Sequence, residues 1–89
     1  MPLVRFTANL AVHCAVRDLR VGGTTVREAL DDAFAMLPQV RSYVLDDQGS
    51  LRKHMAVFID AEQIRDRAGL SDRLAADSAV DIIQALSGG

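Results

Sequence analysis

The chain has 89 residues, 49% of them hydrophobic and 25% charged, a mixture that supports one globular domain and excludes a disordered or fibrous chain. Its formal net charge is −2 and its ten basic residues are scattered, which argues against a nucleic-acid-binding protein. One cysteine allows no internal disulfide, and neither a signal-peptide pattern nor a run of membrane-spanning length is present, so we expect a cytoplasmic protein.

Two strands are expected near the N-terminus. Residues 3–10 alternate apolar and polar side chains, the pattern of a strand with one buried face. A second extended segment is expected at residues 13–21, before Gly22 and Gly23 end it. Together the two segments predict an N-terminal hairpin.

A helix is expected to begin at Thr25. The residues from Thr25 to Glu28 (TVRE) match a capping box, in which the threonine hydroxyl accepts from a first-turn amide and the glutamate reaches back to the cap. Apolar residues then recur at steps of three and four, which gives the helix one face to pack on a sheet: Val26, Ala29, Leu30, Ala33, Phe34 and Leu37. Pro38 is expected to end the helix within a residue or two.

The middle of the chain predicts a loop and two strands. Residues 46–50 (DDQGS) are a cluster of turn formers, which indicates an exposed loop within residues 39–53. Residues 55–59 are an unbroken apolar run of strand length, and we interpret them as a central strand. A turn at residues 60–62 and a short edge strand at residues 63–65 are expected to follow.

The last third predicts a brief helical turn at residues 70–74 and a closing strand at residues 79–85. The resulting order is ββαβββ or close to it. It predicts an α+β fold of the β-grasp kind, a mixed sheet of four to five strands with one main helix on one face. The domain is expected to span residues 1–86 and to leave residues 87–89 as a flexible Gly-Gly tail.

Few side chains suggest chemistry within the domain. Cys14 lies in an apolar stretch and is expected to pack as a small hydrophobe, and His13 and His54 lack partners at metal-ligand spacing. We interpret the basic triplet at residues 52–54 as a solvated strand entrance. Asp60, Glu62 and Asp66 are expected to solvate a turn. We therefore expect no bound metal or cofactor and no catalytic site in this chain.

The C-terminal Gly88-Gly89 is the strongest functional signal. Glycine has no Cβ, so such a terminus can thread a narrow channel and present its carboxylate to another protein's reactive centre. A free carboxylate is a poor electrophile and needs activation, usually as a mixed anhydride with AMP. The sequence has neither a phosphate loop nor a dinucleotide fingerprint, so ATP must be handled by a partner.

Three apolar residues are candidate partner contacts. In the closing strand Val80 and Ile82 have core parity, which turns Ile83 outward. The same alternation turns Phe58 to the outer face, so Phe58 and Ile83 are expected to form an exposed apolar patch. Leu86, just before the tail, is the third candidate.

Three stretches carry a resemblance to a known family: RKHMAVFIDAEQIRD, the strand DSAVDII, and ALSGG at the terminus. With the β-grasp order, the chain resembles the ubiquitin-like sulfur carriers of the MoaD/ThiS group. The resemblance implies that an E1-like enzyme adenylates the terminal carboxylate with ATP and that a sulfur source converts it to a thiocarboxylate. Gly89 would hold the sulfur, Gly88 would let the tail enter partner sites, and Ile83 would contact the activating enzyme.

The implied role is that of a co-substrate which donates sulfur to a synthase or sulfurtransferase in molybdopterin or cysteine biosynthesis. Two alternatives remain open from the sequence. The chain can be a modifier joined through Gly89 to lysines of other proteins, or a noncovalent interaction module that docks through Phe58 and Ile83. None of the three requires the chain to be an enzyme, a nucleic-acid binder or a membrane protein.

Overall fold

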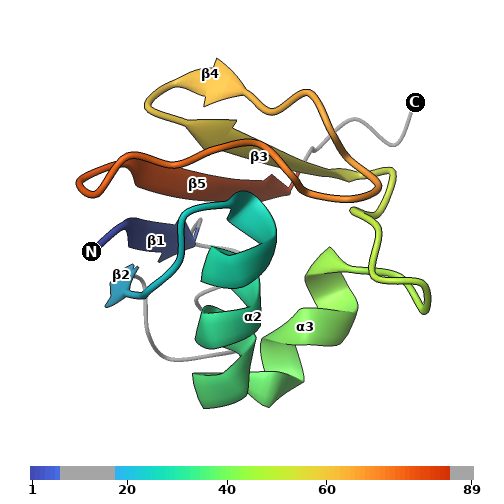
Figure 1. The fold of residues 1–89 in the computed structure, drawn as a ribbon. Helices are drawn as coiled ribbons and strands as arrows, with labels where there is room; N and C mark the ends of the chain where they lie inside the picture. Colours follow the sequence, from blue (N-terminus) through green and yellow to red (C-terminus); the bar gives the residue numbers. More distant parts are fainter. Residues whose placement is uncertain (7–17, 85–89) are drawn as a thin grey trace.

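The computed structural model describes residues 1–6 and 18–84, and these contain five strands in one sheet and two helices (Figure 1). The elements in chain order are β1 (Leu3–Phe6), β2 (Asp18–Arg20), α2 (Val26–Met36), α3 (Pro38–Val44), β3 (Met55–Ile59), β4 (Glu62–Gln63) and β5 (Ala79–Gln84). The expected mixed sheet is confirmed. The rest of the first two predicted strands, with His13 and Cys14, lies outside the described residues.

The sheet has the strand order β2-β1-β5-β3-β4. Strand β5 runs parallel to β1 and antiparallel to β3, while β1–β2 and β3–β4 are antiparallel pairs. The expectation that residues 55–59 form a central strand is confirmed, since β3 pairs with β5 on one side and with β4 on the other. The last strand, β5, takes the middle of the sheet, between β1 and β3.

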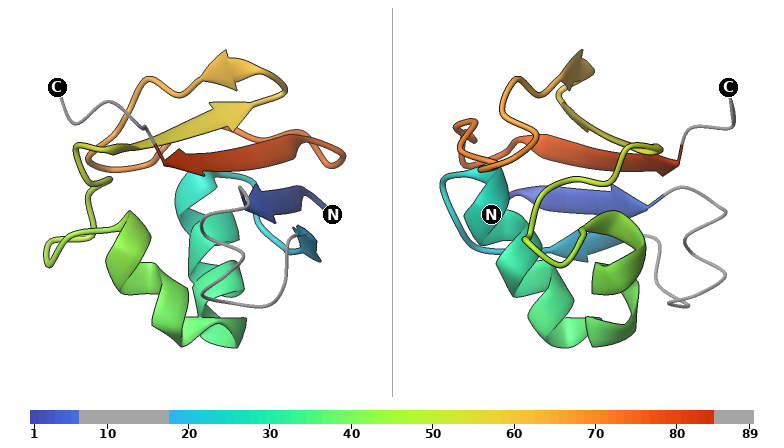
Figure 2. Two further views of the ribbon diagram at one scale, coloured as in Figure 1. Left: turned by 180° about the vertical axis from the view of Figure 1, so that it is seen from behind. Right: turned by 90° about the vertical axis from the view of Figure 1, so that its right-hand side faces the viewer.

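Both helices lie on one side of the sheet, as the two views of Figure 2 show. The face of α2 that the periodicity predicted is the buried one: Val26, Ala29, Leu30, Ala33 and Phe34. It packs with inward-facing strand residues, among which Val4, Val57, Val80 and Ile82 have no exposed surface. Burial of this apolar area is the main force that holds helix and sheet together.

The predicted cap of α2 is present. The Thr25 hydroxyl accepts from the Glu28 amide at 3.2 Å. The Glu28 carboxylate reaches one residue further than a standard capping box, because it accepts from the amide of Thr24 at 2.7 Å and from its hydroxyl at 3.0 Å. These bonds lower the pKa of Glu28, the Thr24 amide contributing most.

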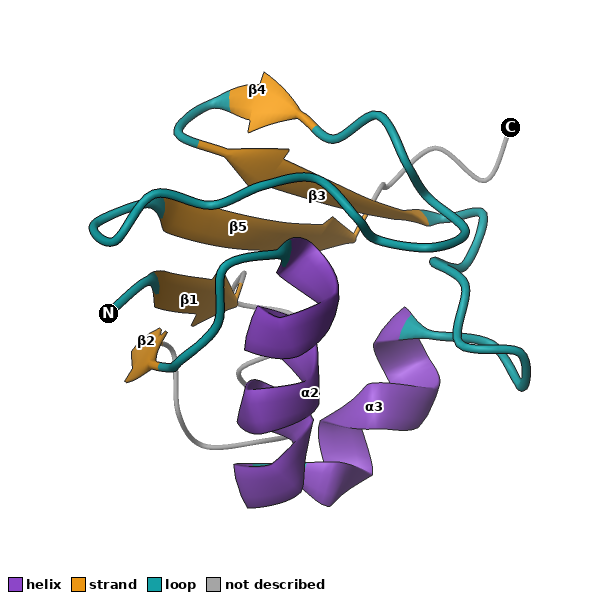
Figure 3. Cartoon of the chain, viewed as in Figure 1, coloured by secondary structure: helices purple, strands orange, loops and turns teal. Residues whose placement is uncertain are grey.

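The second helix, α3, was not expected from the sequence (Figure 3). Pro38 does end α2, which stops at Met36, but the same proline is the first residue of α3. Its missing amide costs nothing there, and its fixed φ suits a helix start. Val40 and Val44 anchor α3 in the core, and the expected loop at residues 46–50 follows it.

Residues 64–78 contain no helix, so the expected helical turn at residues 70–74 is wrong. The carboxylate of Asp72 accepts from the amides of Arg65 and Asp66 at 3.0 and 2.9 Å, and Leu70 takes a left-handed conformation with φ 57°. These local bonds hold the backbone in turns instead of a helix. The expected edge strand is present one residue earlier, at Glu62–Gln63.

Candidate functional site on the outer face of the sheet

The candidate site is the face of the sheet opposite the helices, here called the outer face. Side chains alternate between faces along each strand, so the outer face carries the residues between the buried ones. In the three central strands these are Leu3 and Arg5 of β1, Asp81 and Ile83 of β5, and Ala56 and Phe58 of β3.

Phe58 and Ile83 lie on the outer face, as predicted. The β3–β5 register pairs Ala56 with Ile83 and Phe58 with Asp81, which makes Phe58 and Ile83 diagonal neighbours. Both side chains are partly buried, whereas the large apolar side chains most exposed among the described residues are Met1, Met36 and Tyr43. The patch formed by Phe58 and Ile83 is therefore a flat, partly exposed apolar surface and does not protrude from the sheet.

An ion pair borders this apolar surface. Arg5 of β1 pairs with Asp81 of β5, with Nε to Oδ1 at 2.6 Å and Nη2 to Oδ2 at 2.9 Å. The hydrogen bond and the charge of Asp81 raise the pKa of Arg5. Sequence reasoning missed this pair, because 75 residues separate the two positions and only the parallel β1–β5 register makes them opposite.

A shallow hollow of about 200 Å³ lies beside the pair, lined by Arg5, Phe6, Asp81, Ile82 and Ile83. Its lining combines apolar residues with the Arg5–Asp81 ion pair, whose charged groups can form hydrogen bonds with a partner. Such a mixture suits contact with a protein surface better than capture of a small molecule, since it is open and lacks a convergent set of polar groups.

The predicted tail residues Leu86, Gly88 and Gly89 lie outside the described residues, so their roles stay predictions. The structure does locate the root of the tail. Gln84, the last residue of β5, is opposite Met55, the first residue of β3. The described part of β5 therefore ends at the end of the sheet where β3 begins, one residue after the outward-facing Ile83.

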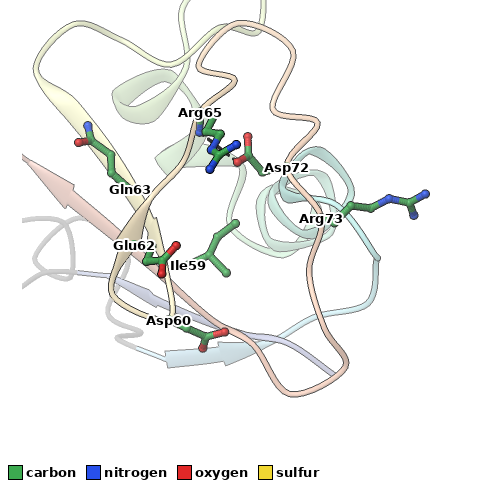
Figure 4. A pocket seen from close by; sticks show the side chains of 7 residues that line it. All are labelled: Ile59, Asp60, Glu62, Gln63, Arg65, Asp72 and Arg73. Carbon is green, nitrogen blue, oxygen red and sulfur yellow. Dashed lines mark hydrogen bonds between the residues drawn. The ribbon is translucent and has the colours of Figure 1, made fainter.

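A larger hollow of about 450 Å³ lies at the opposite end of β3 (Figure 4). It is lined by Ile59, Asp60, Glu62, Gln63, Arg65, Asp72 and Arg73. Several of its carboxylates have structural roles: Asp72 holds backbone amides, and Asp60 Oδ1 accepts from the Ala79 amide at 3.0 Å. This hollow is remote from the root of the tail, because Ile59 pairs with Val80 near the start of β5.

Asp66 also supports a turn. It accepts from the Ser71 hydroxyl at 2.6 Å and from the Gly69 amide at 2.8 Å. These bonds, the Ser71 hydroxyl first, lower the pKa of Asp66. Within residues 1–6 and 18–84, no group of three or more His, Cys, Asp or Glu side chains is arranged to hold a metal ion. No helix in this part of the chain is long and apolar enough to cross a membrane.

A mixed sheet with its last strand in the middle and both helices on one face defines the β-grasp class of ubiquitin-like proteins. The chain belongs to the ThiS family, whose family model matches residues 14–89. It is thus a ubiquitin-like protein of the sulfur carrier or modifier type, as the resemblance to the MoaD/ThiS group implied. A search of curated proteins finds no match.

Solved structures show the same fold. SAMP1 from Haloferax volcanii, a small archaeal modifier protein, is 28% identical with a TM-score of 0.85, and the match covers 99% of this chain and 98% of SAMP1. A chain of the BexX/CysO complex of Amycolatopsis orientalis matches at 21% identity and a TM-score of 0.86, and the match covers 100% of this chain and 100% of the matched chain. CysO from Mycobacterium tuberculosis matches at 20% identity and 0.83, over 97% of this chain and 100% of CysO.

Proposed function

We propose that this protein is a sulfur carrier whose Gly89 carboxylate is adenylated by an E1-like enzyme and then converted to a thiocarboxylate. The thiocarboxylate donates its sulfur to a synthase or sulfurtransferase in molybdopterin or cysteine-type biosynthesis. The observation that carries the proposal is the ThiS family match, which continues through the Gly88-Gly89 terminus.

The proposed chemistry divides between the chain and its partner. The Gly89 carboxylate attacks the α-phosphate of ATP and releases pyrophosphate, which leaves an acyl adenylate with AMP as leaving group. A sulfide sulfur then attacks the acyl carbon, the bond to AMP breaks, and a thiocarboxylate remains. If a persulfide attacks instead, the first product is an acyl disulfide, and a thiol must reduce its S–S bond to release the thiocarboxylate. The chain supplies only the carboxylate, so the ATP site and the catalytic groups belong to the enzyme, and the carrier is a co-substrate.

The outer face supports the docking step. Phe58 and Ile83 lie together on it, and Ile83 is one residue before the end of β5, close to the root of the tail. An apolar contact there would anchor the domain outside the enzyme while residues 85–89 enter its active site. Five residues reach at most about 17 Å beyond Gln84, enough for a short channel.

Intact-mass spectrometry tests the proposal. The full chain is incubated with an E1-like adenylating enzyme from the same organism, ATP and a sulfur source. Its mass should rise by the difference between one sulfur and one oxygen atom, and a chain without Gly88-Gly89 should stay unchanged. An unchanged full-length chain, under conditions in which the enzyme modifies its own known carrier, would contradict the proposal.

A second candidate is a protein modifier joined through Gly89 to lysines of other proteins. The likeness to SAMP1, a small archaeal modifier protein, favours it. Immunoblots of cells that express the tagged chain would then show a ladder of conjugates that disappears when Gly88-Gly89 is deleted. Detection of only the free tagged chain would argue against conjugation.

A further inference from the structure

We propose that the outer face docks on a basic surface of the activating enzyme, where acidic side chains around Arg5 meet lysine or arginine side chains beside the Phe58–Ile83 patch. The inference rests on the proposed activation of the chain by an E1-like enzyme, and it adds the chemistry of the surface that this enzyme must present. Asp18 and Asp81 are the residues that select such a partner.

The pairing registers place five outer-face residues in one row across the sheet. Asp18 of β2 is opposite Arg5 of β1, and Arg5 is opposite Asp81 of β5. Asp81 is in turn opposite Phe58 of β3, and Phe58 is opposite Gln63 of β4. The row is about 20 Å long, since neighbouring strands are about 4.8 Å apart, and it changes along this length from charged to apolar.

The charged half of the row carries an excess of negative charge. The hydrogen bond with Asp81 raises the pKa of Arg5 most, and the charges of Asp81, Asp18 and Asp60 raise it further, so three carboxylates surround one guanidinium. Asp60 is exposed directly after the end of β3. Because two negative charges remain in excess, this part of the face attracts a surface of positive charge.

Two further cations lie outside this row. Arg20, two residues along β2 from Asp18, is opposite Leu3 and donates to the Met1 carbonyl at 3.2 Å. Lys53 is in the turn before β3, five residues along the chain from Phe58. Neither of them pairs with a carboxylate of the row, so the negative excess around Arg5 stays available to a partner.

The charges of the row are within reach of a partner. Among the residues that the structure describes, Asp18 makes no hydrogen bond or ion pair, and it is exposed. The side chains of Arg5 and Asp81 remain 46% and 26% exposed in their ion pair.

The hollow of about 200 Å³ that Arg5, Asp81 and Ile83 help to line gives a partner side chain room to enter. It can hold the end of one long side chain, since a water molecule occupies about 30 Å³. A lysine or arginine of the enzyme can lay its aliphatic stem on Ile83 and bring its charge beside Asp81.

The two halves of the row have different parts in docking. An aromatic anchor such as Phe58 supplies binding energy by burial, whereas charges at the rim of an interface mainly set the association rate and the salt dependence. A second copy of this chain fits the face poorly, because pairing of two outer faces would bring two acidic rows together.

Direct binding tests the inference without any turnover. The Kd of the full chain for the E1-like adenylating enzyme of the same organism is measured without ATP, and it should rise about fivefold from about 50 mM to about 300 mM salt. Asp18→Asn should raise Kd about threefold at the lower salt concentration and Asp18→Lys about tenfold, with smaller differences at the higher one. Arg5→Gln removes the positive charge of the row and should instead lower Kd about twofold.

Matched variants on the other side of the sheet separate position from net charge. Asp31 is an exposed residue of α2, which lies on the opposite side from the outer face (Figure 2). Asp31→Asn and Asp31→Lys make the same changes in net charge as the Asp18 variants and should alter Kd by less than about twofold. Urea unfolding should show that all the variants are folded, and the opposite sign expected for Arg5→Gln cannot come from a loss of stability.

Four outcomes would overturn the inference: no binding of the parent chain, a Kd that salt does not change, equal losses for the Asp18 and Asp31 variants, or dimers of the parent chain that Phe58→Ala disperses. A chain that gains sulfur while its Asp18 variants bind like the parent would sink the inference and leave the carrier function intact. Conversely, the expected salt and charge dependence with no gain of sulfur would sink the carrier proposal and leave the docking surface established.

Discussion

The two faces of the same sheet differ in kind. On the face toward the helices, Val57, Val80 and Ile82 have no exposed surface. On the outer face the neighbouring residues Phe58, Asp81 and Ile83 are partly exposed. Since strand residues alternate between faces, one of two adjacent positions in a strand packs in the core and the other is open to contact with a partner. Substitutions one residue apart can therefore separate stability from function.

The largest expected effect comes from the inner face. Ile82→Ala should destabilise the protein by about 3 kcal/mol, because it removes buried methyl groups and leaves a cavity that the packed core cannot fill. Ile83→Ala, one residue along β5, is the matched control and should cost less than about 1 kcal/mol, since surface substitutions act weakly. Urea unfolding measures both. Equal losses for the two variants would break the distinction between the faces.

The second effect concerns the outer face and function. Phe58→Ala and Ile83→Ala should each weaken docking to the activating enzyme by about tenfold, the loss of about 1.4 kcal/mol expected for an interface anchor. The measurement is KM for the carrier in ATP–pyrophosphate exchange, with Ala56→Ser on the same face as control. Unchanged KM values in both variants would remove the outer face from the docking surface.

A smaller effect is expected from acid. The pKa values of Glu28 and Asp66 are lowered in the folded state, so their contribution to stability is present above the ordinary carboxyl pKa and is lost as pH falls through the lowered values. Glu28→Gln and Asp66→Asn should therefore flatten the loss of thermal stability between about pH 5 and pH 2, relative to the parent chain. Parallel curves for parent and variants would contradict these hydrogen-bond assignments.

The smallest effect is expected for Arg5 and Asp81. Arg5 is exposed at the edge of the apolar surface, and exposed ion pairs contribute little because solvent and salt screen them. A double-mutant cycle with Arg5→Gln and Asp81→Asn should give a small coupling free energy that vanishes in high salt. A large coupling that persists in salt would mean that the outer face also stabilises the fold.

The sequence predicted what depends on local pattern. The spacing of apolar residues and the capping box located α2, and the alternation of side chains along the strands placed Phe58 and Ile83 on the outer face. It did not predict α3, because Pro38 can end one helix and also begin another. Whether a short helix forms after Pro38 depends on the tertiary burial of Val40 and Val44, which the local pattern does not show. It predicted a helical turn at residues 70–74 in error, since side-chain bonds from Asp66 and Asp72 hold that segment in turns.

The features of the candidate site that the sequence did not predict are those that depend on the register between strands. Arg5 faces Asp81, and Met55 faces Gln84, only because β5 pairs with β1 on one side and with β3 on the other. No spacing along the chain encodes these neighbours. The glycine terminus and the apolar parity of β5 could be found from the sequence, but the charges around them could not.

The central claim is that the carboxylate of Gly89 carries the sulfur of a sulfur carrier protein. The most direct test is tandem mass spectrometry of the C-terminal peptide after incubation with the adenylating enzyme, ATP and a sulfur source. The account predicts one oxygen replaced by sulfur on the Gly89 carboxylate and an unmodified Cys14. Sulfur added at Cys14 as a persulfide, with Gly89 still an ordinary carboxylate, would contradict it.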